Sequence, residues 1–203
     1  MRLTLLRPSD YARTPWKNGL GFTDQIAIHP PSADLRRGDY IWRLSSARIE
    51  RESGFSHFPH HDRILVVLEG KGLTLTHTFE EDAPPDKVEL APMEPYEFPG
   101  DVPTHCGLKD GPIRDLSLFF AQGRAQARAE CLKLTPEEEF SWEPSGATQL
   151  IFVLSGAVQL NGLHAAEGET IRADLLGAPS APLLLKAGLE GARAVLVEIE
   201  HGT

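Results

Sequence analysis

Residues 63–70 read RILVVLEG, an almost continuous apolar run that ends in a Glu-Gly turn. Such a run is typical of a short strand that is covered on both faces. Residues 149–156 read QLIFVLSG and repeat the pattern in the second half of the chain. Flanking segments also match, in the same order along the chain. Residues 55–59 (FSHFP) resemble 140–144 (FSWEP), and residues 115–120 resemble 195–200. The matches indicate a duplicated unit of roughly 80–90 residues.

Alternating side chains predict further short strands. In Tyr40–Ile49, Arg43, Ser45, Ala47 and Ile49 share one face. Further strands are expected at 73–78, 88–90, 114–120, 149–154, 157–160, 183–186 and 194–199. A helical pattern is found only near 123–129, and it is weak. The sequence therefore predicts an all-β protein with little helix.

Net charge, apolar content and cysteine content limit the partners and the cellular compartment that we expect for this protein. The formal net charge is -9 and the basic residues are scattered, which argues against a nucleic-acid partner. No apolar run approaches the ~20 residues of a membrane span, and the apolar N-terminal stretch is too short for a signal peptide. Cys106 and Cys131 are interpreted as reduced thiols in a cytoplasmic protein, with a single bridge left open.

The repeated unit resembles a cupin, a small jelly-roll barrel of antiparallel strands. Two copies would make a bicupin, a double-barrel cupin. We expect an N-terminal barrel over 1–122 and a C-terminal barrel over 123–203. Because the second copy is short, strands from the segment before Tyr40 are expected to cross to it. A monomer and a homodimer both fit.

Several segments in order resemble the HutD/Ves family. They are 15–27 (PWKNGLGFTDQIA), 42–47 (WRLSSA), 55–70 (FSHFP leading to DR and LEG), 98–101 (FPGD) and 110–116 (DGPIRDL). The resemblance implies a bicupin connected with histidine utilisation or stress response, without an assigned catalytic activity. It also implies a regulator that senses an intermediate of histidine breakdown. The chain departs from the family pattern at Leu20, where the family has glycine, and at Gln25, where the family has glutamate.

Cupin enzymes hold a metal ion with three histidines and one glutamate, and this chain lacks most of that set. Counting from Gly70 places Arg63 at the glutamate position, and only His57 remains of the first histidine pair. A guanidinium cannot coordinate a metal ion and would repel one. We therefore expect neither metal nor cofactor. The alternative is a metal-dependent cupin enzyme, an oxygenase or isomerase, that uses His57, His105 and a third ligand.

An arginine inside the barrel would instead favour a planar carboxylate, which it can hold with two parallel hydrogen bonds. Arg63 and Arg43 are the candidates, and each could alternatively pair with a protein acid such as Asp62 or Asp115. The stretch Trp16–Gly19, followed by Gly21, can form a loop that closes over the pocket, and the alternative is an ordinary turn before a strand. The predicted ligand is a small acidic metabolite, and a third hypothesis is an interaction module with filled barrels. The sequence shows no recognisable Ser-His-Asp or Cys-His arrangement for nucleophilic catalysis. The predicted ligand-binding residues are Lys17, Asn18, Thr23, Gln25, Arg43, His57, Arg63 and Asp115.

Overall fold

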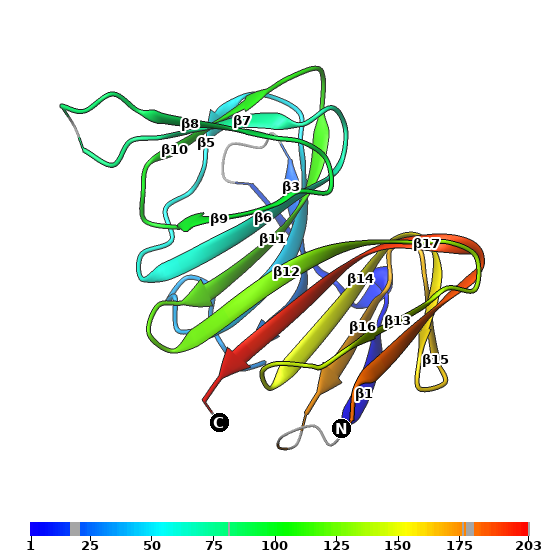
Figure 1. Ribbon diagram of the computed structural model, residues 1–203. Coiled ribbons are helices and arrows are strands. Elements are labelled where there is room, and N and C mark those ends of the chain that lie inside the picture. Colours follow the sequence, from blue (N-terminus) through cyan, green and yellow to red (C-terminus); the bar gives the residue numbers. More distant parts are fainter. Residues whose placement is uncertain (17–20, 81, 176, 178–180, 203) are drawn as a thin grey trace. The chain divides into compact units, whose positions relative to one another are not determined.

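The computed structural model describes residues 1–16, 21–80, 82–175, 177 and 181–202 (Figure 1). Within these residues the chain is built from antiparallel strands, and helix is confined to one 3-10 turn, Pro8–Asp10. The predicted all-β class is therefore confirmed. The chain forms two compact units, one of residues 12–124 and the other of residues 1–11 together with 125–203.

The unit of residues 12–124 contains two sheets. The first has the strand order β2-β3-β4-β11-β6-β9, and the second has the order β5-β10-β7-β8. The strands are β2 (Ala12–Pro15), β3 (Phe22–His29), β4 (Trp42–Ile49), β5 (Ser53–Gly54), β6 (His61–Glu69), β7 (Leu73–His77), β8 (Asp86–Leu90), β9 (Pro95–Pro99), β10 (Thr104–Leu108) and β11 (Ile113–Ala121).

An apolar core joins the inner faces of these two sheets. Leu65 and Val67 of β6 lie in one cluster with Leu73 and Leu75 of β7, and all four are almost completely buried. The alternation of the strands explains this arrangement, because residues two apart point to the same face. The core occupies only part of the inner face and leaves the rest to polar side chains.

Gly70 makes the turn between β6 and β7. Its φ is +101°, and a Cβ there would lie 2.7 Å from the carbonyl oxygen of Pro112. Only glycine meets both conditions without displacing the backbone. The glycine at the end of the RILVVLEG stretch is thus required by the close approach of β6 and the segment before β11.

His77 lies at the end of β7 among the rings of Tyr96 and Phe98. The Thr104 hydroxyl donates to the Val102 carbonyl, so it accepts from Nδ1–H of His77 at 2.9 Å. The histidine Nε2 is then a buried acceptor with no partner among the described residues. Burial lowers the pKa of His77, and the nearby Asp86 opposes this.

The other unit has one sheet with the order β1-β16-β14-β17-β12, in which β13 also pairs with β17 and β15 with β14. Its strands are β1 (Arg2–Leu6), β12 (Ala125–Leu134), β13 (Glu139–Trp142), β14 (Thr148–Leu160), β15 (Leu163–Ala166), β16 (Thr170–Asp174) and β17 (Leu183–His201). The N-terminal β1 therefore belongs to the same sheet as the C-terminal strands. An apolar cluster that includes Trp142, Ile151 and Leu185 fills the interior of this unit.

The structure corrects two details of the strand prediction. Residues 125–134 form β12 rather than a helix, because each of its residues pairs with β17. The strands expected at 149–154 and 157–160 are one strand, β14, and those expected at 183–186 and 194–199 are both parts of β17 (Figure 1). Register shifts in the β14–β17 pairing let these long strands bend without ending. Among the described residues, no helix has the length and apolar character needed to cross a membrane.

Candidate functional site

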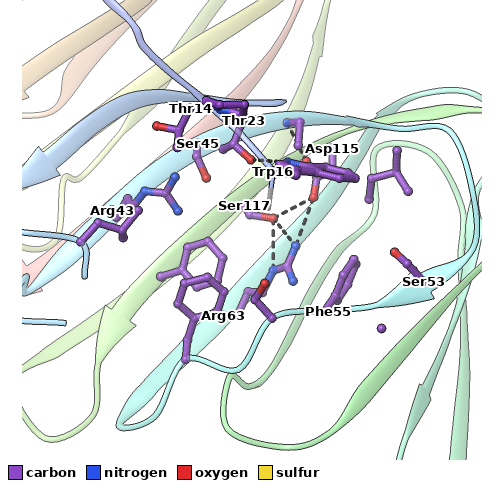
Figure 2. Close-up of a pocket in the computed structure, with 18 residues that line it drawn as sticks. Thr14, Trp16, Thr23, Arg43, Ser45, Ser53, Phe55, Arg63, Asp115 and Ser117 are labelled. Carbon is purple, nitrogen blue, oxygen red and sulfur yellow. Dashed lines mark hydrogen bonds and ion pairs between the residues drawn. The ribbon is translucent and has the colours of Figure 1, made fainter. Parts of the chain in front are cut away.

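A cavity of about 420 Å³ opens in the unit of residues 12–124 (Figure 2). This volume lies within the range of roughly 300–1,000 Å³ that is usual for small-molecule sites. Aromatic and hydroxyl-bearing side chains make up most of the wall, together with two arginines and one aspartate. The lining residues are Thr14, Pro15, Trp16, Thr23, Leu35, Arg43, Ser45, Ala47, Ile49, Ser53, Gly54, Phe55, Ser56, Phe58, Arg63, Asp115, Ser117 and Phe119.

Strand periodicity brings the polar groups together. On β4, Arg43 and Ser45 lie two residues apart and face the cavity, and on β11 Asp115 and Ser117 do the same. Arg63 faces the cavity from β6. Strand β11 lies between β4 and β6 and pairs with both. Three adjacent strands of one sheet therefore supply all three charged groups of the wall and two of its hydroxyl groups.

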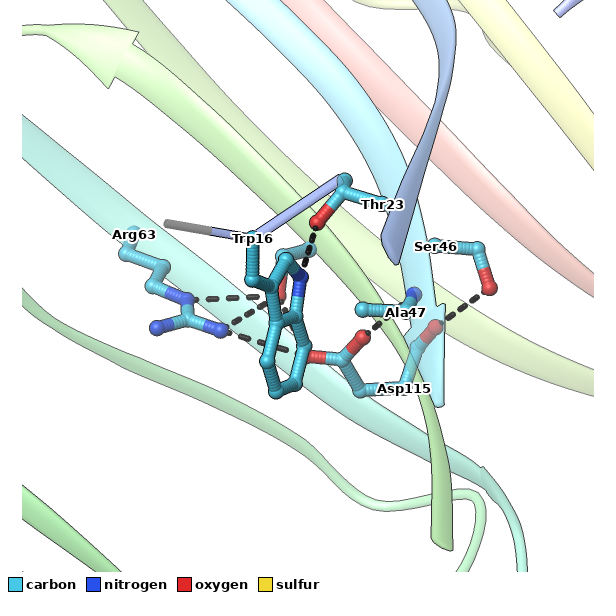
Figure 3. A network of polar contacts seen from close by, with 7 residues as sticks. Trp16, Thr23, Ser46, Ala47, Arg63 and Asp115 are labelled. Carbon is cyan, nitrogen blue, oxygen red and sulfur yellow. Dashed lines mark hydrogen bonds and ion pairs between the residues drawn. The ribbon is translucent and has the colours of Figure 1, made fainter. Parts of the chain in front are cut away.

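Arg63 is held in a closed polar network (Figure 3). Its Nη2 donates to Oδ2 of Asp115 at 3.2 Å and to Oγ of Ser117 at 2.8 Å. The serine hydroxyl in turn donates to the same carboxylate oxygen at 3.0 Å, and the backbone N–H of Ala47 donates to Oδ1 at 2.9 Å. Both charged side chains are buried, with exposed fractions of 6% for Arg63 and 2% for Asp115. The network forms a buried, internally neutralised ion pair.

Three aromatic rings surround the Arg63 guanidinium. Its central carbon lies 4.0 Å from the ring centroid of Phe55, 5.1 Å from that of Phe119 and 5.5 Å from that of Phe98. These distances are in the range of cation–π contacts. Burial lowers the pKa of Arg63 and the Asp115 carboxylate raises it, but a guanidinium remains protonated in proteins. The side chain is fixed in place as a cation.

Arg43 has a different environment. Only 4% of it is exposed, and its Nε donates to the amide Oε1 of Gln25 at 3.0 Å. Within the described residues this is the one hydrogen bond of its guanidinium, and no carboxylate lies within ion-pair distance. Burial lowers the pKa of Arg43, with opposing contributions from Tyr40 and Asp115. Figure 2 shows the guanidinium at the cavity without a bond to any other residue drawn there. Arg43 is thus a buried cation without a counterion in the described part of the chain.

Trp16 covers another part of the cavity wall. Its indole Nε1 donates to the Thr23 hydroxyl at 2.9 Å, and its backbone N–H donates to the Gly21 carbonyl at 2.8 Å (Figure 3). A Cβ at residue 21 would lie 3.3 Å from the indole ring. A glycine at this position leaves room for the indole ring beside the backbone just before β3.

The structure places the predicted ligand-binding residues in three groups. Thr23, Arg43, Arg63 and Asp115 all line the cavity, and Gln25 lies behind Arg43 as its hydrogen-bond partner. His57 is exposed and is not among the lining residues. Lys17 and Asn18 lie outside the described residues. The alternative that Arg63 pairs with a protein acid is realised with Asp115 rather than Asp62.

The sequence did not single out Ser117, Phe119 or Phe55 as wall residues, and it indicated Trp16 only as part of a loop that could close over the pocket. A signal for two of them was present, because Asp115, Ser117 and Phe119 alternate along one strand and must share a face. The positions of Phe55 and Trp16 depend on loops that run before β6 and after β2. Sequence periodicity does not reach such segments.

The residues at the positions of a cupin metal motif do not fit a metal ion. Within the described ranges, no group of three or more His, Cys, Asp or Glu side chains is close enough to hold one. His57 and His105 are both exposed, and the position expected for a glutamate ligand carries the Arg63 guanidinium. Asp115 is already engaged by three donors.

Comparisons with known proteins match most of the chain to the same group of proteins. A family model described as HutD matches residues 8–187. An uncharacterised 21.2 kDa protein from the hutC 3′ region of Pseudomonas putida is 36% identical over 162 residues, which cover 79% of this chain and 78% of that protein. Protein Ves of Cronobacter sakazakii is 29% identical over 153 residues, which cover 72% and 73% of the two chains.

A solved structure of HutD from Pseudomonas fluorescens, described as a formate condition, is 29% identical with a TM-score of 0.77 and covers 100% of both chains. More distant structures show the fold alone. Bacterial pirin YhhW of Escherichia coli, in complex with nickel(II), is 12% identical with a TM-score of 0.66 and covers 100% of both chains. Hazelnut vicilin is 8% identical with a TM-score of 0.68 and covers 97% of this chain and 85% of its own. These proteins are cupins, so the fold class is the one that the repeated unit predicts.

Proposed function

Because the chain belongs to the HutD family, we propose that it binds a small carboxylate metabolite and acts as a sensor or regulator in histidine utilisation. The link to histidine utilisation comes from the Pseudomonas putida relative, which is described by its place next to hutC. The carboxylate comes from the chemistry of the cavity. Two free cysteines, Cys106 and Cys131, support a cytoplasmic setting for this role.

The observation that carries the proposal is that the buried charge of Arg43 has no counterion among the residues that the structure describes. A buried cation without a counterion is costly, and proteins pair such groups when no ligand has to be accommodated. The terminal nitrogens of Arg43 form a planar fork of donors that matches the two oxygens of a carboxylate. A ligand carboxylate at this fork would supply the missing negative charge.

The rest of the wall fits the body of a small metabolite. Phe58, Phe119 and Trp16 offer apolar faces, whereas Ser45, Ser53 and Ser56 offer hydroxyl groups. Ligand sites usually combine mostly apolar walls with a few polar groups that fix the orientation. Products of histidine breakdown that carry a carboxylate and a nitrogen-containing end, such as urocanate, N-formylglutamate and formiminoglutamate, are suitable candidates.

The test measures binding of these three acids, and of formate as the smallest carboxylate, by titration calorimetry and thermal unfolding. We expect at least one of the three metabolites to bind with a dissociation constant in the millimolar range or lower. Its binding should also raise the unfolding temperature. Arg43→Met should weaken that binding by at least about 30-fold, since removing one partner of a buried charge pair costs about 2 kcal/mol or more.

Arg48→Met is the matched control. Arg48 is on the same strand but is exposed and pairs with Glu50, so its loss should leave binding unchanged. The unliganded Arg43→Met protein should be at least as stable as the wild type, because a buried unpaired charge has been removed. The proposed function is wrong if none of the acids stabilises the protein at about 10 mM, or if both variants bind like the wild type.

A further inference from the structure

Among the described residues that line the cavity, the charged groups do not balance. Arg63 and Asp115 form a buried ion pair and cancel one another. Arg43 remains as an excess positive charge. The neighbouring Tyr40 cannot neutralise it, because burial raises the pKa of this tyrosine to about 12 and keeps the hydroxyl protonated. The sign of the net charge therefore depends on what lies against Arg43.

Gln25 is the residue that lies there. It is on β3, opposite Ser45 of β4, just before the bulge between Gln25 and Ala27. Its Oε1 accepts from Nε of Arg43 at 3.0 Å, and the terminal nitrogens of the guanidinium have no hydrogen bond to a described residue. The amide thus orients the guanidinium without adding a charge.

We propose that Gln25 is the specificity-determining residue of the cavity, because its neutral amide orients Arg43 while leaving the positive charge available to an anionic ligand. The inference rests on the proposed function and extends it to the selection of ligand charge. A glutamate has almost the same size as glutamine and would accept the same hydrogen bond. Its carboxylate would form an ion pair with Arg43, and the empty cavity would then carry no net charge. A ligand carboxylate would meet a like charge in place of a free cation.

The experiment compares two substitutions that separate charge from hydrogen bonding. Gln25→Glu keeps an acceptor for Arg43 and adds a negative charge, whereas Gln25→Met keeps the length and neutrality and removes the acceptor. Binding of urocanate, N-formylglutamate and formate is measured by calorimetry on the full chain, with the neutral methyl ester of urocanate as a counter-probe. Gln126→Glu, an exposed glutamine on β12, controls for the change in net charge.

We expect Gln25→Glu to weaken binding of the acids on the order of 100-fold, because like charges brought together in a site cost several kcal/mol. The neutral ester should lose far less, so the ratio of acid to ester affinity should fall. Gln25→Met should stay within about tenfold of the wild type, since the charge of Arg43 is retained. Gln126→Glu should bind like the wild type.

A purely structural role of Gln25 gives the reverse order, with Gln25→Met the weaker binder and Gln25→Glu close to the wild type. That order, or an unchanged ratio of acid to ester affinity in Gln25→Glu, overturns the inference while the proposed function stands. If the wild type binds none of the acids, the proposed function fails and the inference falls with it. Thermal unfolding checks the fold, and Gln25→Glu should unfold at the same temperature as the wild type or higher because it gains an ion pair with Arg43.

Discussion

Replacing Asp115 with asparagine tests whether the Arg63–Asp115 network is a real buried ion pair. Asparagine has nearly the same shape, and its oxygen can still accept from the backbone N–H of Ala47. Its amide nitrogen would then face the Arg63 guanidinium and the Ser117 hydroxyl, where the wild type has an acceptor. Arg63 would lose its counterion at an exposed fraction of 6%.

The magnitude follows from burial. Removing one partner of a buried ion pair costs roughly 3–5 kcal/mol, because the other charge is left uncompensated. For a chain of this size, a loss of about 4 kcal/mol corresponds to a decrease in Tm of roughly 8–16 °C. Asp24→Asn is the matched control, because Asp24 pairs with Arg13 at 2.7 Å but the arginine side chain is 61% exposed. An exposed pair contributes at most about 1 kcal/mol, so the control should lower Tm by only a few degrees.

The assay is urea unfolding of Asp115→Asn, Arg63→Met and the double variant, with circular dichroism as the signal. The loss of unfolding free energy in the double variant should be smaller than the sum of the two single losses by about 1–3 kcal/mol, because the double variant removes both charges together. A loss below about 1 kcal/mol for Asp115→Asn, or additive losses in the double variant, would refute the buried ion pair.

Three further predictions concern other residues. His77→Gln should flatten the dependence of stability on pH between 7 and 5: burial lowers the pKa of the folded histidine, the unfolded state binds more protons below about pH 6.5, and wild-type stability is lost as pH falls. Binding of N-formylglutamate should change the fluorescence of Trp16, so Trp16→Phe should abolish most of the signal and Trp142→Phe, a core residue of the other unit, should keep it. Gly70→Ala should cost about 3 kcal/mol in urea unfolding, because φ is positive and the Pro112 oxygen is in the way. Gly111→Ala, with positive φ but open space, should cost only about 1 kcal/mol.

Much of the fold could be predicted because its signals are local. Apolar runs and alternation along single segments predicted β4, β6, β7 and β8, whereas the two-residue strand β5 is too short to leave such a signal. The segment 123–129 was misread as helix because its alanines and charged residues favour helix locally, whereas pairing of β12 with β17 over a long sequence separation decides the outcome. Local preference cannot report such a partner.

The site was predictable to the extent that one strand determines it. The shared face of Arg43 and Ser45 follows from alternation along β4, and it is the face that the cavity uses. The partnership of Arg43 with Gln25 could not be predicted, because it depends on the register between β3 and β4 and on a bulge in that pairing. The contrast between Arg63, which has a carboxylate partner, and Arg43, which has none in the described part of the chain, likewise requires knowing which acid lies within reach.

The pairing of β1 with β16 has a consequence for how the chain can be divided. Residues 12–124 are contiguous, so in topological terms they are an insertion between the first strand of a sheet and the remainder of that sheet. A fragment that starts at Ala125 would leave one edge of β16 uncovered and open to pairing with another chain. Adding Met1–Tyr11 as a separate peptide should restore that edge, and splicing the same peptide after the C-terminus would amount to a circular permutation.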